Sequence, residues 1–212
     1  MIYDAFRWLA IITGYPFVWL YSKTKVYYEN KSVQSRKLRG GALIISNHYS
    51  VWDFVQNMFL LLPRKLNVVA GEIAYKNKFL VFGMKFFGGV QANRVTKSLS
   101  FIDSSIRLIK DGQLVQIFPE GHNNIDGKIA EFKPTYLMIA LKSGRPIIPI
   151  VTDGNYGLFK RAHVIIGEPI DLSDYIGDNL PSKEVLAELN NMVYEKVVSL
   201  KSQLDESAKG KK

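Results

Sequence analysis

The residues of this chain that are best placed to do chemistry are a histidine and an aspartate five positions apart. His48 follows the apolar run 42–46, which is typical of a buried strand, and Asp53 lies near the start of an apolar segment that is predicted to be helical. Because α/β sheets bind ligands at the carboxyl ends of their strands, His48 is expected at a ligand-binding edge. Asp53 can then accept a hydrogen bond from imidazole Nδ1 and leave Nε2 free to take a proton.

A second interpretation gives the same two residues no chemical role. The pattern H-x-x-x-x-D is short, so His48 can be an ordinary loop histidine, and Asp53 can simply complement the positive end of the helix dipole. Ser50 can cap the same helix. The pair therefore needs support from other parts of the chain.

Two further segments place polar residues directly after predicted strands. Glu120 and Gly121 follow the apolar run 114–118 in the sequence FPEG, where the glycine permits a tight turn with exposed backbone N–H groups. Arg94 ends the segment GGVQANR, and its planar guanidinium suits a phosphate group. The alternative is that Glu120 and Arg94 are ordinary surface residues, because isolated glutamate and arginine side chains are usually found on the surface.

The composition favours an anionic partner and excludes several kinds of site. The 212 residues carry a net charge of +9, and 47% of them are hydrophobic, which is typical of a globular domain. Nucleic acid, anionic lipid, a phosphorylated substrate and an acidic carrier protein all fit this charge. The chain has no cysteine, which excludes a thiol nucleophile, a disulfide framework and a cysteine-ligated metal.

The elements that must position these residues alternate along the chain. Apolar runs predict strands at 42–46, 67–70, 89–92, 114–118, 147–151 and 163–166, and periodic apolar residues predict helices at 54–62, 78–87, 98–110, 134–142 and 183–204. This alternation predicts one α/β domain, residues 40–204, with a mostly parallel central sheet flanked by helices. A polar tail, residues 205–212, is expected to fray.

The first 39 residues are predicted to form a membrane-associating helical segment and a basic linker. Residues 8–21 carry no charge but are fewer than the roughly 20 needed for a span, and Gly14 and Pro16 are expected to bend or break the helix. Tryptophan and tyrosine lie at both ends, and six basic residues follow between 23 and 39. We expect this segment to lie on the cytoplasmic face of a membrane without crossing it. A core-packing helix followed by a solvated basic loop is the alternative.

Taken in order, four blocks resemble the glycerolipid acyltransferase family that includes the lysophosphatidate acyltransferases. The blocks are NHYSVWD, GGVQANR, FPEG and PIIPIV. They are similar to the family's N-H-x-x-x-x-D, G-x-[IV]-x-x-x-R, F-P-E-G and an apolar block with an internal proline. The first and third blocks are specific, the other two are loose, and together they cover residues 40–152.

The resemblance implies an O-acyltransferase that needs no metal and no cofactor. His48, oriented by Asp53, would act as general base on an acceptor hydroxyl, which then attacks the thioester of acyl-CoA or acyl carrier protein. Arg94, Glu120 and Gly121 would bind the acceptor. The expected acceptor is a lysophospholipid at the membrane surface, 1-acylglycerol-3-phosphate, which would give phosphatidate.

One departure from the family pattern concerns the acceptor. The family often continues FPEG with threonine and an arginine associated with the acceptor phosphate, whereas this chain continues His122-Asn123-Asn124. Either another basic residue substitutes, or the acceptor is another lysolipid, an amino-lipid or a glycolipid. The candidate substitutes are Lys128, Lys133, Lys142 and Arg145. A non-catalytic lipid-binding protein is the alternative outside the enzymes. Nucleic acid is disfavoured, because the basic residues lie beside an apolar segment.

Overall fold

A computed structural model describes residues 2–32, 34, 36–71, 81, 84, 88–92, 99–124, 127–177 and 179–209, and side chains from residue 7 onward. Arg94 and most of the predicted helix at 78–87 lie outside these residues, so the structure does not test them.

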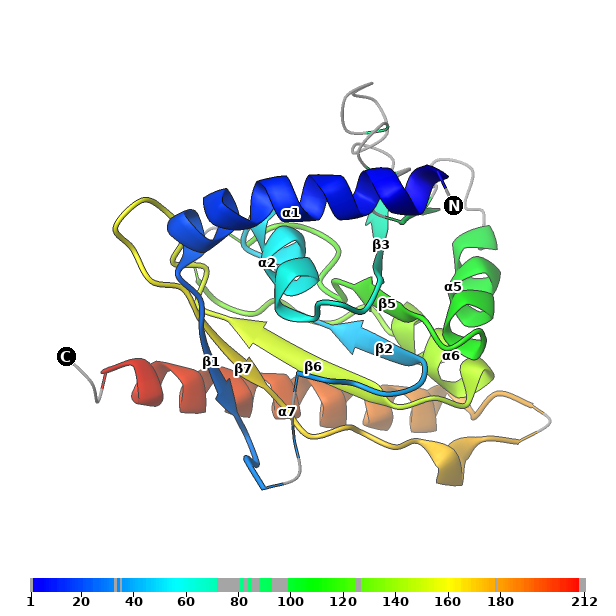
Figure 1. Cartoon of the computed structure of the whole chain (residues 1–212). Coiled ribbons are helices and arrows are strands. Elements are labelled where there is room, and N and C mark those ends of the chain that lie inside the picture. Colours follow the sequence, from blue (N-terminus) through cyan, green and yellow to red (C-terminus); the bar gives the residue numbers. More distant parts are fainter. Residues whose placement is uncertain are drawn as a thin grey trace.

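One seven-stranded sheet forms the centre of the molecule, in the order β1-β7-β6-β2-β5-β3-β4 (Figure 1). The strands are β1 (Lys25–Tyr28), β2 (Ala42–Ile45), β3 (Leu66–Gly71), β4 (Gly89–Ala92), β5 (Leu114–Ile117), β6 (Ile147–Thr152) and β7 (His163–Ile166). Neighbours from β6 to β4 are all parallel, whereas β7 runs antiparallel to β6. The predicted α/β class with a mostly parallel sheet is therefore confirmed.

Helices cover both faces of this sheet. The helix α2 (Trp52–Leu60) packs on one face, with α1 (Ile2–Ser22) lying over it, and α5 (Ser100–Lys110), α6 (Thr135–Ser143) and α7 (Lys183–Lys209) pack on the other (Figure 1). Both faces of β2 are buried, because Ile44 packs on the side of α2 and Ile45 packs on the side of α7. Strands buried on both faces are largely apolar and show no alternation, although β5 also buries Gln116.

Pro149 lies inside a central strand, although a proline in an apolar run is typical of an edge strand. The residue marks the point at which β6 changes partner. Residues 147–149 pair with β2, and residues 150–152 pair with β7. The ring therefore falls at the end of one ladder, where its missing N–H removes the least pairing.

The basic linker contains a strand that the sequence patterns did not predict. Residues 25–28 pair in parallel with β7, from Lys25 opposite His163 to Tyr28 opposite Ile166. Val26 and Tyr28 pack on one face and Tyr27 on the other, so the segment belongs to the sheet. At the other end of the chain, α7 continues to Lys209, five residues beyond its predicted end, and buries Leu204 on the way.

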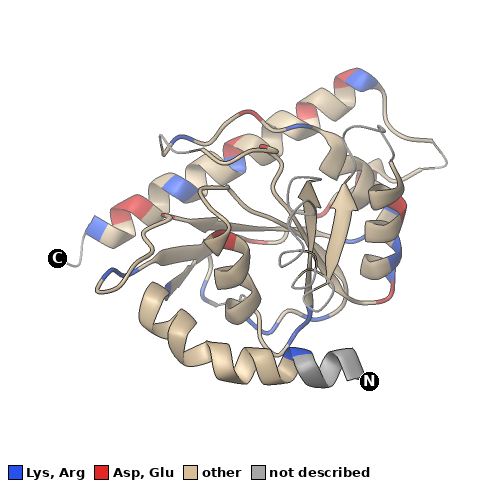
Figure 2. Ribbon diagram, turned by 90° about the horizontal axis from the view of Figure 1, so that it is seen from above, with Lys and Arg blue, Asp and Glu red and all other residues tan. Residues whose placement is uncertain are grey.

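The N-terminal segment is one helix that Gly14 and Pro16 do not interrupt. It packs on α2, where the rings of Tyr15 and Phe59 are in tilted contact with centroids 5.9 Å apart, and its Ile11 is buried. Seen from above in Figure 2, α1 carries no charge after Arg7, whereas α7 alternates between both signs. Among the described residues, no helix combines the length and apolar character needed to cross a membrane.

Candidate active site

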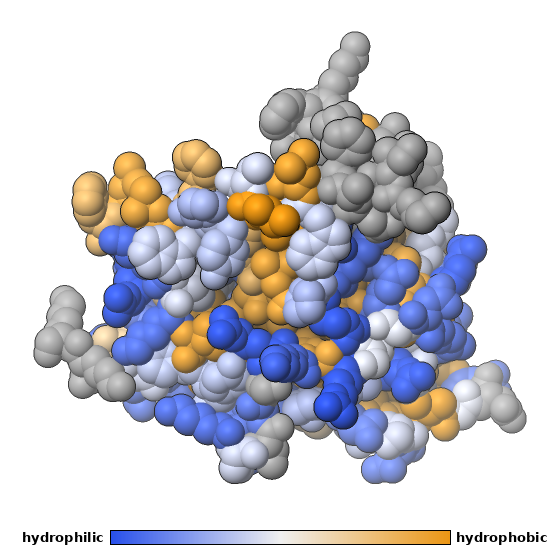
Figure 3. Space-filling model, in the orientation of Figure 1, coloured by the Kyte–Doolittle hydropathy of each residue, from blue (hydrophilic) through white to orange (hydrophobic). Residues whose placement is uncertain are grey.

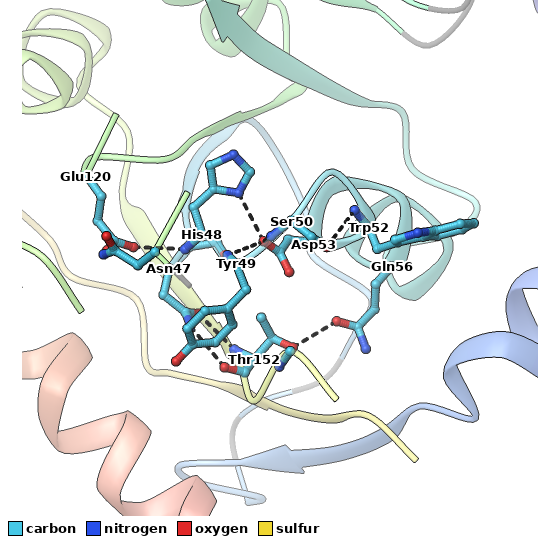
Figure 4. A network of polar contacts seen from close by, with 12 residues as sticks. Asn47, His48, Tyr49, Ser50, Trp52, Asp53, Gln56, Glu120 and Thr152 are labelled. Carbon is cyan, nitrogen blue, oxygen red and sulfur yellow. Dashed lines mark hydrogen bonds and ion pairs between the residues drawn. The ribbon is translucent and has the colours of Figure 1, made fainter. Parts of the chain in front are cut away.

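Three strands bring the predicted site residues to one edge of the sheet. Ile45 at the end of β2 lies opposite Ile117 of β5 and Pro149 of β6. The strand ends therefore lie side by side, and His48 and Glu120 follow β2 and β5 while Thr152 ends β6 (Figure 4). This is the carboxyl edge, where ligands bind in sheets of this type.

His48 and Asp53 form the predicted pair. The imidazole Nδ1 lies 3.0 Å from Asp53 Oδ2, and the aspartate side chain is fully buried while 17% of the histidine side chain is exposed. The ring stacks on Phe118 with centroids 3.9 Å apart, which fixes its plane. Because Nδ1 faces the carboxylate, Nε2 points away from it, and Nε2 has no hydrogen-bond partner among the described residues. The geometry leaves Nε2 available as a base.

Asp53 accepts four hydrogen bonds in this structure. Besides His48, its Oδ2 accepts from the backbone N–H groups of Tyr49 at 2.6 Å and Ser50 at 2.8 Å, and its Oδ1 accepts from the Tyr156 hydroxyl at 2.7 Å. A buried carboxylate that accepts this many hydrogen bonds is fixed in place. Asp53 also lies in the first turn of α2, but a residue that only complemented the helix dipole would need no burial and no histidine.

Ser50 has the capping role that its position suggested. Its Oγ accepts a hydrogen bond from the Trp52 N–H at 3.1 Å, at the first residue of α2. The hydroxyl is thereby engaged by the helix terminus, which satisfies one of the free N–H groups there.

Glu120 is buried and turned toward the protein. Its Oε1 accepts from the backbone N–H of His48 at 2.8 Å, and its Oε2 accepts from the Ala130 N–H at 2.8 Å and from the Asn124 amide. Burial raises the pKa of the Glu120 carboxyl above its usual value, and these donors partly oppose that shift. The contacts link the FPEG turn to the histidine loop. Direct contact of Glu120 with an acceptor stays a prediction.

Gly121 forms the tight turn that the FPEG sequence predicted. Its φ is +74°, in the region that favours glycine, and its N–H donates to the Phe118 carbonyl at 3.0 Å. This N–H therefore closes the turn and does not point outward. Contact of Gly121 with the acceptor, like that of Arg94, stays a prediction.

Four residues of this network were not predicted as site residues, although Asn47 opens the NHYSVWD block. The Asn47 side chain bonds both backbone groups of Thr152, at 2.9 Å each, and so ties the ends of β2 and β6 together. Tyr156 lies 2.9 Å from Gln56 Oε1 as well as 2.7 Å from Asp53, and the Thr152 hydroxyl reaches Gln56 at 3.1 Å. Tyr156 follows the apolar strand that ends at this edge, and that position is the signal that could have identified it.

Tyr156 is a hydrogen-bond donor to Asp53 of the His48–Asp53 pair. Burial and the neighbouring Asp53 carboxylate raise the pKa of the Tyr156 phenol well above its usual value near 10. The phenol therefore keeps its proton near neutral pH and donates it to Asp53 Oδ1. It is a positioning residue, because it reaches the histidine only through the aspartate.

Replacing Tyr156 by phenylalanine tests this role. We expect kcat to fall about tenfold with little change in KM, because a hydrogen bond to a charged group is lost while the substrate surfaces stay intact. The acidic limb of the pH–rate profile should move to higher pH, because a carboxylate that has lost a donor holds a protonated imidazole more strongly. Steady-state kinetics across pH measure both effects. Tyr175→Phe, at an exposed tyrosine far along the chain, is the matched control. An unchanged profile would argue that Tyr156 only packs.

Of the four basic residues considered for an acceptor phosphate, two lie near the site. Lys128 and Lys133 follow the FPEG turn, and the Lys133 N–H donates to the Pro119 carbonyl at 3.0 Å. Lys142 ends α6 and Arg145 precedes β6, so both lie at the opposite, amino edge of the sheet. The parallel topology thus excludes Lys142 and Arg145 as ligands of a group bound at His48.

Comparison with known proteins gives one consistent result. A family model described as Acyltransferase matches residues 24–153. A 1-acyl-sn-glycerol-3-phosphate acyltransferase of Bacillus subtilis is 28% identical over 78% of this chain and 84% of its own length. One of Haemophilus influenzae is 26% identical over 90% of this chain and 81% of its own. The crystal structure of the 1-acyl-sn-glycerophosphate acyltransferase PlsC from Thermotoga maritima has a similar fold, with a TM-score of 0.60 and 23% identity, over 88% of this chain and 74% of that one.

Proposed function

This chain belongs to the Acyltransferase family, and on that premise we propose that it transfers a fatty acyl group from a thioester to the hydroxyl of a lysophospholipid. The donor is acyl-CoA or acyl carrier protein, and the main acceptor is 1-acylglycerol-3-phosphate, which becomes phosphatidate. The observation that carries the proposal is the hydrogen bond of 3.0 Å between His48 Nδ1 and Asp53 at the carboxyl edge of the sheet.

The histidine acts as general base in the proposed reaction. Nε2 takes the proton of the acceptor hydroxyl as the oxygen attacks the thioester carbonyl carbon, and the new C–O bond forms. The tetrahedral intermediate then expels the thiolate as the C–S bond breaks, and the imidazolium returns the proton to sulfur. Asp53 stabilises the imidazolium that exists between these steps.

The reaction needs only that both substrates are held together. Attack by the acceptor oxygen on the donor carbonyl is direct, so no acyl-enzyme forms, and the rate depends on how well the two groups are aligned. A nucleophilic role for Ser50 is unnecessary, because its hydroxyl already accepts a hydrogen bond from the start of α2. The chain supplies the base, its orientation by Asp53, and a fixed loop through Glu120.

The identity of the acceptor rests on the names of the relatives and on the charge near the site. Two relatives that cover most of this chain are called 1-acyl-sn-glycerol-3-phosphate acyltransferases. Lys128 is exposed at the same edge as His48, and we propose that Lys128 and Arg94 bind the acceptor phosphate in place of the arginine that does not follow FPEG here. A different lysolipid acceptor is the second candidate, because His122-Asn123-Asn124 occupies that position.

We also propose that the enzyme works on the cytoplasmic face of a membrane, with α1 as its membrane-associating segment. Large apolar side chains of α1 are exposed, among them Phe17 at 75% and Trp19 at 58%. In Figure 3 apolar and aromatic side chains gather along the upper rim, where α1 lies in Figure 1. A helix that packs one side on the protein and exposes the other suits a position in the plane of the interface.

An acceptor screen tests the function. Purified protein is given one long-chain acyl-CoA or acyl carrier protein and a panel of lysolipids, and the acylated product is measured. We expect transfer to 1-acylglycerol-3-phosphate to exceed transfer to lysophosphatidylcholine at least tenfold, because basic side chains pair with a phosphate monoester. Equal rates, or a preference for an acceptor without a phosphate, would contradict the assigned acceptor. Hydrolysis of the thioester without transfer would contradict the proposed reaction.

A further inference from the structure

The loop that joins β6 to β7, residues 153–162, carries two large apolar side chains at its tip. Leu158 is 58% exposed, and Phe159 is 92% exposed, the largest exposed fraction among the large hydrophobic residues that the structure describes. Single apolar residues on a surface are common. Two adjacent ones, beside an exposed apolar helix, form a patch that points to a partner.

The conformation of the tip is strained. Phe159 has a φ of +67°, in a region that bulky side chains rarely adopt. Lys23 is the other non-glycine residue with a positive φ among those described, and its ammonium lies 5.8 Å from the centre of the Phe159 ring. Strain of this kind persists where the surrounding structure enforces it, and it is concentrated at functional positions.

The protein holds the base of this loop firmly. Asp153 pairs with His163 Nδ1 at 2.7 Å, across the two ends of the loop. The Gly157 N–H donates to the Tyr21 carbonyl at 3.0 Å, and the Ala162 N–H donates to the Ser22 carbonyl at 2.7 Å. The tip is therefore fixed beside the C-terminal end of α1, as Figure 1 shows for the yellow loop and the blue helix.

The exposed charged side chains of this loop are basic, and its acidic residue, Asp153, is paired with His163 at the base of the loop. Lys160 and Arg161 are exposed and follow Phe159 directly. Neither the loop from 154 to 162 nor the helix from 8 to 22 contains an acidic residue. Exposed apolar side chains followed directly by exposed basic ones match an anionic lipid surface. The apolar side chains enter the acyl-chain region, and the basic side chains pair with the headgroups.

We infer that Leu158 and Phe159 form a second membrane-inserting element, which acts with α1 to set the orientation of the enzyme on anionic lipid. The inference rests on the proposed function at a membrane surface. Two contacts with the bilayer fix the tilt of a protein, whereas one helix alone leaves rotation about its axis free. The same loop carries Tyr156, whose hydroxyl donates to Asp53, so the anchored tip lies three residues from the His48–Asp53 network. Docking of the tip therefore brings this edge of the sheet to the lipid surface.

The absence of cysteine from the chain makes a direct test possible. Single cysteines are introduced into the full chain as Phe159→Cys, Phe17→Cys and Ser202→Cys, and each is labelled with an environment-sensitive fluorophore. Ser202 is exposed on α7, on the other side of the sheet from α1. With vesicles of phosphatidylcholine and phosphatidylglycerol, we expect the labels at 159 and 17 to shift to the blue and to be quenched by lipid-borne quenchers. The label at 202 should do neither.

The outcomes separate the inference from the function on which it rests. A shift at 17 without a shift at 159 would overturn the second element and leave α1 as the anchor. No shift at either position would overturn both the inference and the proposed location at a membrane. Acyl transfer by the unlabelled protein to a short-chain, water-soluble acceptor is measured in parallel, and it reports the chemistry independently of vesicles.

A second variant distinguishes lipid insertion from a structural role for Phe159. Phe159→Gly removes the apolar ring and relieves the positive φ, so we expect unchanged or higher thermal stability together with about tenfold weaker binding to the mixed vesicles. Lys160→Ser with Arg161→Ser should weaken binding to mixed vesicles while leaving binding to pure phosphatidylcholine unchanged. Lower stability of Phe159→Gly with unchanged binding would overturn the inference. Loss of a vesicle-independent dimer in that variant would also overturn it, in favour of a contact between two copies.

Discussion

Replacing His48 by alanine should lower kcat for acyl transfer about a thousandfold or more. The substitution removes the imidazole that Asp53 orients and whose Nε2 would take the acceptor proton, and general base catalysis is worth about 10²–10⁴-fold. Asp53 orients the base and does not replace it, because its carboxylate is buried and already accepts hydrogen bonds from Tyr49, Ser50 and Tyr156. Rates are measured with saturating acyl donor and the best acceptor of the screen.

The fold should tolerate the loss of the His48 ring. The imidazole is partly exposed, and its main packing contact is the stack on Phe118, so the midpoint of thermal unfolding should change by no more than a few degrees. His122→Ala is the matched control, since it removes an exposed histidine from the same edge. We expect that control to keep activity within a few-fold of the wild type. Residual activity of His48→Ala within tenfold of the wild type would rule out the general-base role.

Asp53→Asn should lower kcat by a similar factor, about a thousandfold, while leaving the fold intact. The amide oxygen can still accept the three donors at Oδ2, and the Tyr156 hydroxyl can turn to accept from the new NH₂ group. The missing negative charge no longer stabilises the imidazolium, which is the state that must form as the proton is taken. Kinetics and thermal unfolding of the same preparation separate these two effects.

Two further variants show whether the effect of Asp53→Asn comes from its contact with His48 or only from its place at the start of a helix. Asp53→Ala leaves the His48, Tyr49 and Ser50 donors without this acceptor, so we expect a loss of several kcal/mol of stability in addition to the loss of activity. Asp103→Asn alters an exposed aspartate in the first turn of α5, where only the helix dipole is affected. That control should change stability by less than about 1 kcal/mol and leave kcat unchanged. If Asp53→Asn behaved like Asp103→Asn, the helix-dipole interpretation of Asp53 would be correct.

Local patterns in the sequence were sufficient to predict the His48–Asp53 pair and most helices and strands. His48 and Asp53 are five residues apart at one strand-to-helix junction, so their contact depends on the geometry of a single loop. Strands β2, β5 and β7 were predicted because apolar residues dominate each of them, which is typical of strands whose two faces are both covered. The glycine of FPEG likewise determined its turn, since its φ of +74° is available to few other residues.

The strand β1 could not be predicted, because it exists only through its partner. Its four residues lie among lysines and are all half-buried, so neither periodicity nor an apolar run marks them. Pairing with β7, far away in the sequence, supplies the hydrogen bonds that make them a strand. For α1 the error was the opposite one: a bend or break at Gly14 and Pro16 was predicted, but the helix is continuous. Contacts of α1 with α2 stabilise it across both residues.

By itself, then, the sequence determined which residues can do chemistry here and that they lie near the carboxyl end of a parallel sheet. The tertiary structure decided how they are held. It turned Glu120 inward, because the N–H groups of His48 and Ala130 converge on its carboxylate. It brought Tyr156 to Asp53 from a loop about a hundred residues away, because β2 and β6 are neighbours in register. Spacing along a chain can predict a contact within one loop, whereas a contact between loops depends on which strands pair.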